Sequence, residues 1–118
     1  MNNLSDILNG IIDDALSIGF PVSQYLERKI YIDKKRYDRV GACYRYRFPE
    51  KYEIHLSEEI IKTDIKVIKS VIAHEVLHTC FLTMDHNYFW VMYQQKMNEK
   101  FGYNIQIKYV WEEIFDKE

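Results

Sequence analysis

The sequence predicts a single domain of the α+β class over residues 1–118, with an N-terminal helix, a three- to four-stranded sheet that contains a hairpin, and two further helices. Apolar residues recur at helical spacing near the N-terminus and again after residue 64, and alternating aromatic or β-branched runs lie between these stretches. The 10 Tyr, 6 Phe and 2 Trp supply enough apolar surface for a core. A length of 118 residues excludes an eight-fold α/β barrel, which needs roughly 250 residues, and leaves too little chain for a doubly wound dinucleotide fold with a substrate site.

The first predicted element is a helix that Asn3 or Ser5 caps and that Gly19 and Pro21 end. Its apolar positions are Leu4, Ile7, Leu8, Ile11 and Ala15.

Strands are predicted over residues 29–32, 42–48 and 52–56, and the last two form a hairpin around the turn residues 49–51. Side chains alternate along a strand. One face of the third strand therefore carries Tyr52, Ile54 and Leu56, and the other carries Glu53 and His55, with His55 exposed.

Helices are predicted in the second half of the chain. Asp64 is expected to cap a long helix that continues through Leu82. Another helix is predicted over residues 86–101, with Gly102 in the position favoured after a helix end. The tail over residues 103–111 alternates weakly and is expected to return to the sheet.

The long helix contains the motif His74-Glu75-Val76-Leu77-His78. Residues four apart lie above one another on a helix, so both imidazoles can reach one tetrahedral ion. Glu75 projects beside that ion, where it can take a proton from an attacking water and later pass one to a leaving amine. Zinc accepts nitrogen ligands and does no redox chemistry, so one catalytic Zn²⁺ is the expected cofactor. The pattern predicts metal ligands at His74 and His78 and a catalytic base at Glu75.

A catalytic zinc needs a third protein ligand and keeps one position open. We expect His86, which follows His78 by eight residues and lies where the chain reverses. Its neighbour Asp85 could instead ligate the ion, or accept the other imidazole N–H. Cys80 projects away from His78 around the helix, so a buried, inert thiol is expected there. More distant alternatives for the third ligand are Glu112 and Glu113.

The net charge of −2 conceals a basic segment, because residues 28–51 carry nine bases and three acids, a net charge of +6. Residues 1–27 and 52–118 each have a net charge of −4. Aromatic residues are interleaved with the bases, a combination that suits phosphate contacts and base stacking. The alternative is a solvated hairpin whose aromatic side chains face the core. The candidate nucleic-acid-binding residues are Arg28, Lys29, Lys34, Lys35, Arg36, Arg39, Arg45 and Arg47.

Two cysteines, Cys43 and Cys80, are too few for a disulfide scaffold. The N-terminal residues lack a basic n-region, and no apolar run approaches the roughly 18 residues of a membrane span. These observations favour a reducing, cytoplasmic location without a membrane partner.

Several segments around and upstream of the histidine motif carry recognisable residue patterns. They are 72–80, His86-Asn87-Tyr88-Phe89-Trp90, Met97-Asn98, Gly102-Tyr103-Asn104-Ile105, Gly41-Ala42-Cys43 and Tyr52-Glu53-Ile54-His55-Leu56-Ser57. Together they resemble SprT-like zinc metallopeptidases, a family that includes the eukaryotic Spartan proteases, over about residues 20–106. Asn87 departs from the family, which often has Gly after the third histidine, whereas Trp90 stands in its expected place.

The resemblance implies a small zincin-like metallopeptidase core in which His74, His78 and His86 bind zinc and Glu75 is the general base. The chain then corresponds to a SprT-like domain over residues 1–118 without the C-terminal zinc ribbon of many members. Some members cleave proteins that are bound to DNA, which makes DNA a candidate partner of residues 28–51.

The expected function is a zinc-dependent endopeptidase that acts on a protein or peptide, with DNA-associated proteins as candidate substrates. Residues 52–56 are expected to offer a strand edge to an extended peptide, and Tyr103, Tyr109 and the basic residues are candidate oxyanion donors. Two alternatives stay open. One is a DNA-binding module with a structural or vestigial zinc site, and the other is a metal-dependent hydrolase of another substrate.

Overall fold

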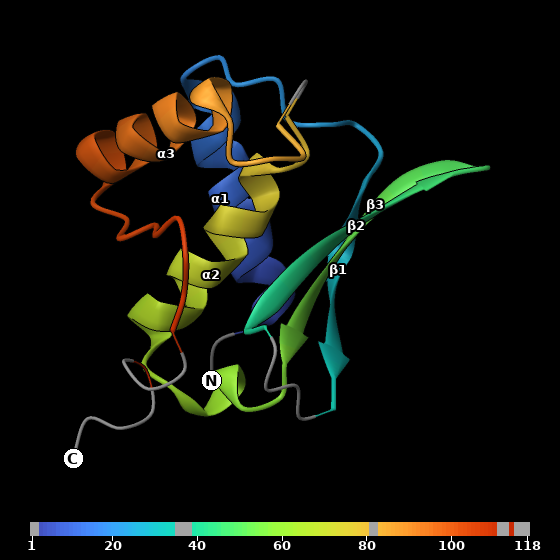
Figure 1. The fold of residues 1–118 in the computed structure, drawn as a ribbon, viewed down its shortest axis with the longest axis vertical. Helices are drawn as coiled ribbons and strands as arrows, with labels where there is room; N and C mark the ends of the chain where they lie inside the picture. The colour runs from blue at the N-terminus through green and yellow to red at the C-terminus, as the bar shows by residue number, and fades with distance from the viewer. Residues whose placement is uncertain (1–2, 35–38, 81–82, 111–113, 115–118) are drawn as a thin grey trace.

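The computed structural model describes residues 3–34, 39–80, 83–110 and 114. The described helices lie on one side of a curved three-stranded sheet (Figure 1), which confirms the predicted α+β class. The elements are helices α1 (Leu4–Ser17), α2 (Ile65–Leu77) and α3 (Tyr88–Phe101), a short 3-10 helix η1 (Ile60–Lys62), and strands β1 (Leu26–Asp33), β2 (Gly41–Arg47) and β3 (Glu50–Ser57).

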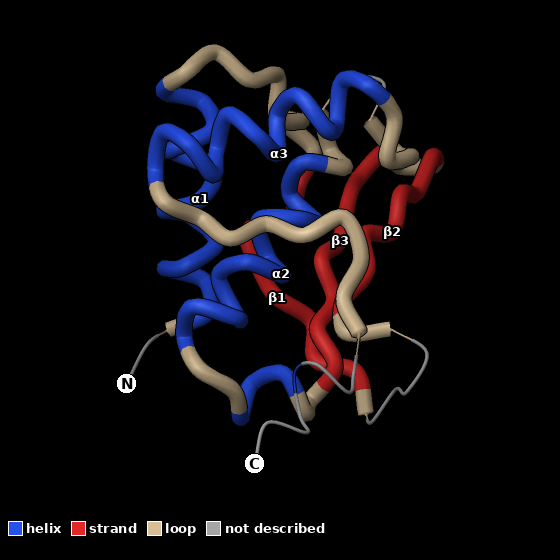
Figure 2. Tube along the Cα trace, turned by 60° about the vertical axis from the view of Figure 1, so that its left-hand side comes forward, coloured by secondary structure: helices blue, strands red, loops and turns tan. Residues whose placement is uncertain are grey.

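The sheet has the strand order β1-β3-β2, with β3 parallel to β1 and antiparallel to β2. β3 is therefore the central strand (Figure 2), and both of its edges are paired. The expectation that residues 52–56 offer a free edge is wrong for this reason. The free edge next to the hairpin belongs to β2, because no second strand pairs with it among the described residues. The hairpin turn is Phe48 and Pro49, since Glu50 already pairs with Arg47.

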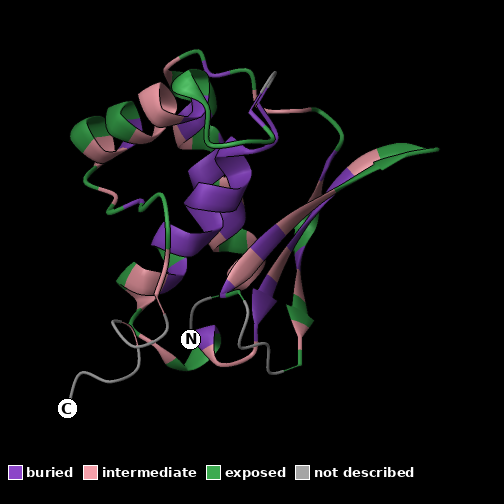
Figure 3. Cartoon of the chain, in the orientation of Figure 1, coloured by how far each residue is buried: buried purple, intermediate pink, exposed green. Residues whose placement is uncertain are grey.

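The core is centred on α2, which is buried along most of its length (Figure 3). All residues from 71 to 77 are buried, and the helix contacts α1, α3, β2 and β3. The central strand adds Ile54 and Leu56 to this core, as the alternation of its side chains predicts. α1 forms as predicted, with Asn3 as its cap. Because the histidine motif lies in α2, packing on several sides determines its position.

α2 ends earlier than predicted, at Leu77 instead of residue 82. The Thr79 hydroxyl donates a hydrogen bond to Val76 O, and the Thr83 hydroxyl donates to Leu77 O. Such side-chain hydroxyls compete with backbone N–H groups for the carbonyls of a helix end. The chain therefore leaves the helix just after the motif and turns toward α3.

α3 begins later than predicted, at Tyr88, because the Asn87 side chain accepts a hydrogen bond from Trp90 N–H and caps the helix. His86 accordingly lies in the loop between α2 and α3, not in the first turn of α3. The other end agrees with the prediction, since Gly102 follows α3 in the left-handed conformation with φ of 76°.

The segment after α3 does not return to the sheet as expected. The described residues 103–110 contain no strand, and they pass alongside α2 instead. The Asn98 side chain on α3 accepts a hydrogen bond from Ile105 N–H and donates one to Ile105 O, which turns the segment back. Ile105 is buried, so the tail adds to the helical side of the core and the described sheet has three strands, not four.

Candidate metal centre

Three histidines converge beside the C-terminal end of α2. His74 and His78 lie one helical turn apart, and their ring centroids are separated by 5.1 Å. His86 reaches both from the loop before α3, with its Nε2 atom 3.0 Å from Nε2 of His74 and 3.1 Å from Nε2 of His78. One ligand atom from each residue lies within 4.8 Å of the others. The three side chains are therefore close enough to bind one metal ion.

The nitrogen set fits a tetrahedral ion. Zn–N bonds of about 2.0–2.1 Å place two ligand nitrogens roughly 3.3 Å apart, close to the separations of 3.0 and 3.1 Å found here. Within the described ranges, no fourth His, Cys, Asp or Glu joins the cluster. Three imidazoles leave one position for water or substrate, an arrangement typical of catalytic and not of structural zinc sites.

Main-chain carbonyls select the tautomer of the two helical histidines. His74 Nδ1 lies 2.6 Å from Gln106 O, and His78 Nδ1 lies 2.6 Å from Thr83 O. A carbonyl oxygen only accepts hydrogen bonds, so Nδ1 carries the proton in both rings. Nε2 of each ring consequently keeps the lone pair that a metal ion needs.

Burial favours the neutral form of these imidazoles. Desolvation lowers the pKa of His74 to about 3, against the opposing effect of its hydrogen bond to Gln106, and the nearby His78 and His86 lower it further. Desolvation also lowers the pKa of His78 and of His86. Metal ligation requires the neutral ring, so the centre is prepared for an ion near neutral pH.

Trp90 packs against all three rings. It is completely buried, and its ring centroid lies 4.7 Å from that of His74, 5.6 Å from that of His78 and 4.6 Å from that of His86. Its Nε1–H group donates a hydrogen bond of 3.4 Å to His74 O. Trp90 therefore restricts the orientation of the histidines from the side of α3.

Glu75 lies between the histidines and the start of β2. Its side chain is buried, and its Oε2 atom is 4.0 Å from His74 Nε2. Burial raises the pKa of Glu75 to about 8, an effect that Arg39 opposes. The carboxylate faces Gly41, where a Cβ atom would lie 3.4 Å from Glu75 Oε2 and 2.8 Å from Val71 Cγ1. A Cβ atom at residue 41 would overlap Val71 Cγ1, so the glycine allows α2 and β2 to approach closely beside Glu75.

Of the two tyrosines considered as oxyanion donors, Tyr109 lies at the centre. Its ring centroid is 5.4 Å from that of His74, its hydroxyl is 2.5 Å from Ser70 Oγ, and it accepts a hydrogen bond from Gln106 N–H. Tyr109 thereby holds the backbone of Gln106, the residue whose carbonyl binds His74. Tyr103 instead donates its hydroxyl to a carboxylate of α1, 2.6 Å away.

The other candidate ligands lie apart from the cluster. Asp85 favours the protonated forms of His78 and His86 through its charge, but no hydrogen bond joins it to an imidazole in the described part of the chain. Cys80 is buried, and this burial raises the pKa of its thiol to about 12, as expected for an inert cysteine. Glu112 and Glu113 lie outside the described residues.

His55 lies on the face of the sheet opposite the helices. Its Nδ1 atom is 2.9 Å from Asp33 Oδ1, and its Nε2 atom is 3.0 Å from Glu53 Oε1. Tyr31 stacks on the imidazole at a centroid distance of 4.9 Å, and Tyr44 meets it edge-on at 4.6 Å. His55 was predicted to be exposed, but this cluster of charged and aromatic side chains half-buries it.

The basic segment begins with two residues that point in different directions. Arg28 donates a hydrogen bond of 2.8 Å to Asn9 on α1. Lys29 lies over the ring of Tyr31, 4.8 Å from its centroid, on the side of the His55 cluster. Adjacent strand residues face opposite sides of a sheet, which accounts for this division.

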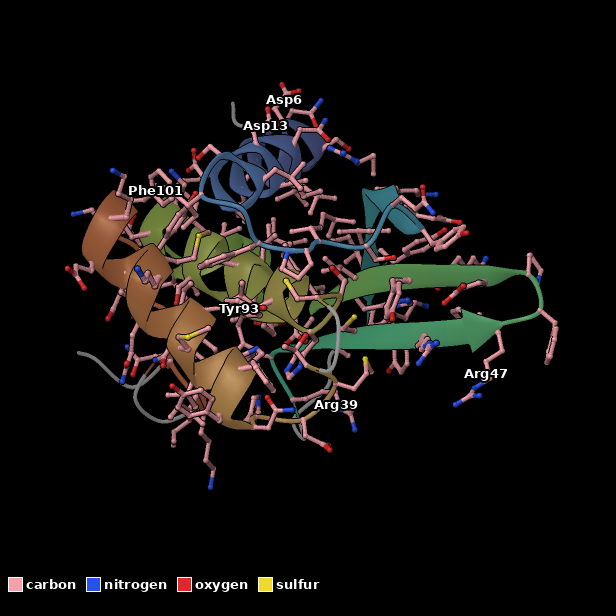
Figure 4. All side chains as sticks on the ribbon, turned by 90° about the horizontal axis from the view of Figure 1, so that it is seen from above. Asp6, Asp13, Arg39, Arg47, Tyr93 and Phe101 are labelled. Atoms are coloured by element: carbon pink, nitrogen blue, oxygen red, sulfur yellow. The ribbon has the colours of Figure 1, made fainter. Side chains whose placement is uncertain are left out.

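The remaining bases are spread along the hairpin. Arg39 precedes β2 and Arg47 ends it (Figure 4), and Arg45 forms an ion pair of 3.2 Å with Glu50. Lys34 is exposed directly after β1, whereas Lys35 and Arg36 lie outside the described residues. The described bases thus occupy several sides of the hairpin and β1, and a nucleic-acid interface there stays a prediction.

Three residues that were not among the candidate site residues shape the centre. Gln106 and Thr83 contribute only backbone carbonyls, which every residue possesses, so no sequence pattern marks them. Gly41 contributes the absence of a side chain. Its signals in the sequence were its place in the segment Gly41-Ala42-Cys43, which carries part of the family resemblance, and its position at the start of an alternating run.

Comparison with protein-family models, with curated proteins and with solved structures finds no match for this chain. In the part of the chain that the structure describes, no helix combines the length and apolar character needed to cross a membrane.

Proposed function

We propose that the chain is a zinc-dependent peptidase of the SprT-like kind, with His74, His78 and His86 as ligands and Glu75 as general base. The supporting observation is the convergence of three imidazole nitrogens beside one buried carboxylate. A zinc ion bound there supplies Lewis acidity, which polarises a carbonyl oxygen and makes hydroxide accessible near neutral pH.

Glu75 performs the proton transfers in this proposal. Its Oε2 atom lies 4.0 Å from Nε2 of His74, and the side chain is shielded from bulk solvent. It takes a proton from the attacking water and returns one to the nitrogen of the cleaved peptide bond, which then leaves as a neutral amine. Proton transfer by a positioned side chain typically contributes about 10²–10⁴ in rate.

The free edge of β2 favours a polypeptide as the substrate. Ser57 N–H donates to Val40 O, so alternation along the strand directs the N–H and C=O groups of Gly41, Cys43 and Arg45 away from β3. An extended chain can pair with such groups by adding a strand to the sheet. This edge begins next to the proposed base, which supports a peptide bond as the group that is hydrolysed.

A DNA-binding module with a structural zinc site has less support. Structural zinc sites are usually closed by four protein ligands, whereas the described residues offer three. The choice of a DNA-associated protein as substrate has a separate basis, which is the family resemblance alone.

The substitution Glu75→Gln tests the proposal. We expect the zinc-loaded wild-type chain to cleave denatured casein and the variant to lose at least about a hundredfold in rate, because glutamine accepts no proton. Zinc content, measured by elemental analysis of both proteins, should be equal, since Glu75 is not a ligand. Glu99→Gln, on the exposed face of α3, is the matched control and should retain full activity.

Turnover by the Glu75→Gln variant would remove Glu75 from its role. Absence of zinc-dependent cleavage by the wild-type chain would contradict the peptidase proposal itself.

A further inference from the structure

A groove of about 760 Å³ lies next to the metal centre, between the hairpin, the segment before β1 and the loop that connects α2 with α3. Asp85 and Asn87, the neighbours of His86, line one part of it. Thr83, whose carbonyl binds His78, lines it as well. The groove and the histidines thus share one loop, and a molecule bound at the centre can extend into the groove.

Three large apolar side chains line part of this groove, among polar residues, although solvent reaches them. Tyr25 is 46% exposed, Met84 is 42% exposed and Phe89 is 44% exposed, and all three line it. Tyr25 precedes β1, Met84 lies in the loop between α2 and α3, and Phe89 lies in α3, yet all three line the same groove. An apolar group that covers these side chains removes their apolar surface from water, which favours its binding.

The hairpin contributes charges that neutralise each other. Arg45 and Glu50 line the groove and form an ion pair of 3.2 Å with one another. Asp85, at the part of the groove beside His86, is the remaining acid of the lining. The lining therefore favours a neutral, apolar side chain over an acidic one.

The free edge of β2 connects the centre with the groove. Gly41 lies next to the Glu75 side chain, and Arg45 lines the groove. Arg45 follows Gly41 by four positions along the strand, which is about 13 Å at 3.3 Å per residue. Directly opposite residues of paired strands point to the same face of a sheet. A substrate residue opposite Arg45 would therefore point toward the groove when the peptide bond to be cleaved lies near Gly41.

We infer that this groove binds a large apolar side chain of the polypeptide substrate, three to five residues away from the cleaved bond. The inference rests on the proposed function, because it takes the occupant to be the substrate chain that extends β2. It assigns to Phe89 and Met84 a role in substrate selection that is separate from the chemistry at Glu75.

Peptide binding to the zinc-loaded Glu75→Gln chain tests the inference without requiring turnover. The probes are fluorescein-labelled extended peptides of Ser, Thr, Gly and Lys in which one Phe is moved along the sequence, compared with the same peptides carrying Ala. Fluorescence anisotropy should show one preferred Phe position with an affinity about tenfold higher than that of the Ala peptide. Adding Phe89→Ala or Met84→Ser to the chain should abolish this preference.

Leu16→Ala is the matched control, because Leu16 on α1 is 48% exposed but does not line the groove. Binding without a preferred Phe position, or a preference that survives both groove substitutions, would overturn the inference. If the preference is present and depends on Phe89 while the wild-type chain fails to cleave the same peptides, the groove assignment stands and the peptidase proposal fails. If cleavage occurs, product masses should place Phe three to five residues from the cut.

Discussion

At the scale of single residues, the centre depends on a glycine as much as on its histidines. Gly41 allows α2 and β2 to approach so closely that Val71 and Glu75 face the strand backbone directly. The proposed base is thus buried between a proposed metal ligand and the start of β2.

Gly41→Ala should destabilise the fold and reduce activity. The new Cβ would lie 2.8 Å from Val71 Cγ1, so the strand or the helix must shift. Overpacking of this kind typically costs about 1–3 kcal/mol. Urea denaturation should show this loss, and casein cleavage should fall because Glu75 and the edge of β2 move apart.

Gly10→Ala serves as its control, since a Cβ at Gly10 in α1 meets nothing within 4 Å. That substitution should stabilise the fold by about 0.5–1 kcal/mol through helix propensity. A Gly41→Ala protein as stable and active as the wild type would show that the approach of α2 to β2 is not needed.

At the scale of elements, the end of α2 and the loop that follows it form one unit. The Thr83 hydroxyl is 2.5 Å from both Leu77 O and Cys80 O, while its carbonyl binds His78. One residue therefore both ends the helix and orients a ligand. The loop that carries His86 starts from this anchored point.

Thr83→Val should weaken both stability and metal binding. The substitution keeps the side-chain volume but removes the hydroxyl bonded to both carbonyls, which then keep only backbone N–H donors, 3.3 Å away at Leu77 O and 3.2 Å away at Cys80 O. The loss of this hydrogen bonding should cost about 0.5–1.5 kcal/mol. Zinc affinity, measured by chelator competition, should fall about 10–100-fold, as it does when the partner of a ligating histidine is disturbed. Thr83→Ser retains the hydroxyl and should preserve both properties. Unchanged zinc affinity in the valine variant would mean that His78 is oriented without Thr83.

In the whole molecule, the centre joins two consecutive segments and the distant C-terminal tail. α2 supplies two imidazoles, the loop before α3 supplies the third, and the tail supplies the Gln106 carbonyl. An ion bound to all three imidazoles stabilises only the folded chain, because these segments separate on unfolding.

Zinc should therefore raise the unfolding temperature. Free zinc at 100 times its Kd adds about 2.7 kcal/mol to the free energy of unfolding, which corresponds to about 10 °C or more for a domain of this size. His86→Ala should abolish the shift in thermal scans with and without zinc. His55→Ala, on the far face of the sheet, should keep it. A full shift in the His86→Ala protein would assign the third ligand elsewhere.

The features that depend on neighbouring residues could be predicted from the amino-acid sequence. Helical spacing places His74 and His78 on one face of α2 whatever surrounds them, and the left-handed Gly102 ends α3 for reasons confined to its own backbone. The same holds for the Asn3 cap of α1 and for the alternation that buries Ile54. In each case the backbone geometry of a few neighbouring residues is enough to predict the feature.

The sheet order and the environment of the histidines depend on contacts between distant segments, which the sequence pattern does not show. Alternation of side chains does not distinguish a central strand from an edge strand. The sheet order therefore had to show that the free edge belongs to β2 and not, as expected, to β3. The carbonyls that fix the histidine tautomers come from Thr83 and from Gln106, which lies 32 residues from His74. Backbone groups are the same in every residue, so only folding brings particular ones to the imidazoles and makes the histidine pattern into a centre that can bind a metal ion.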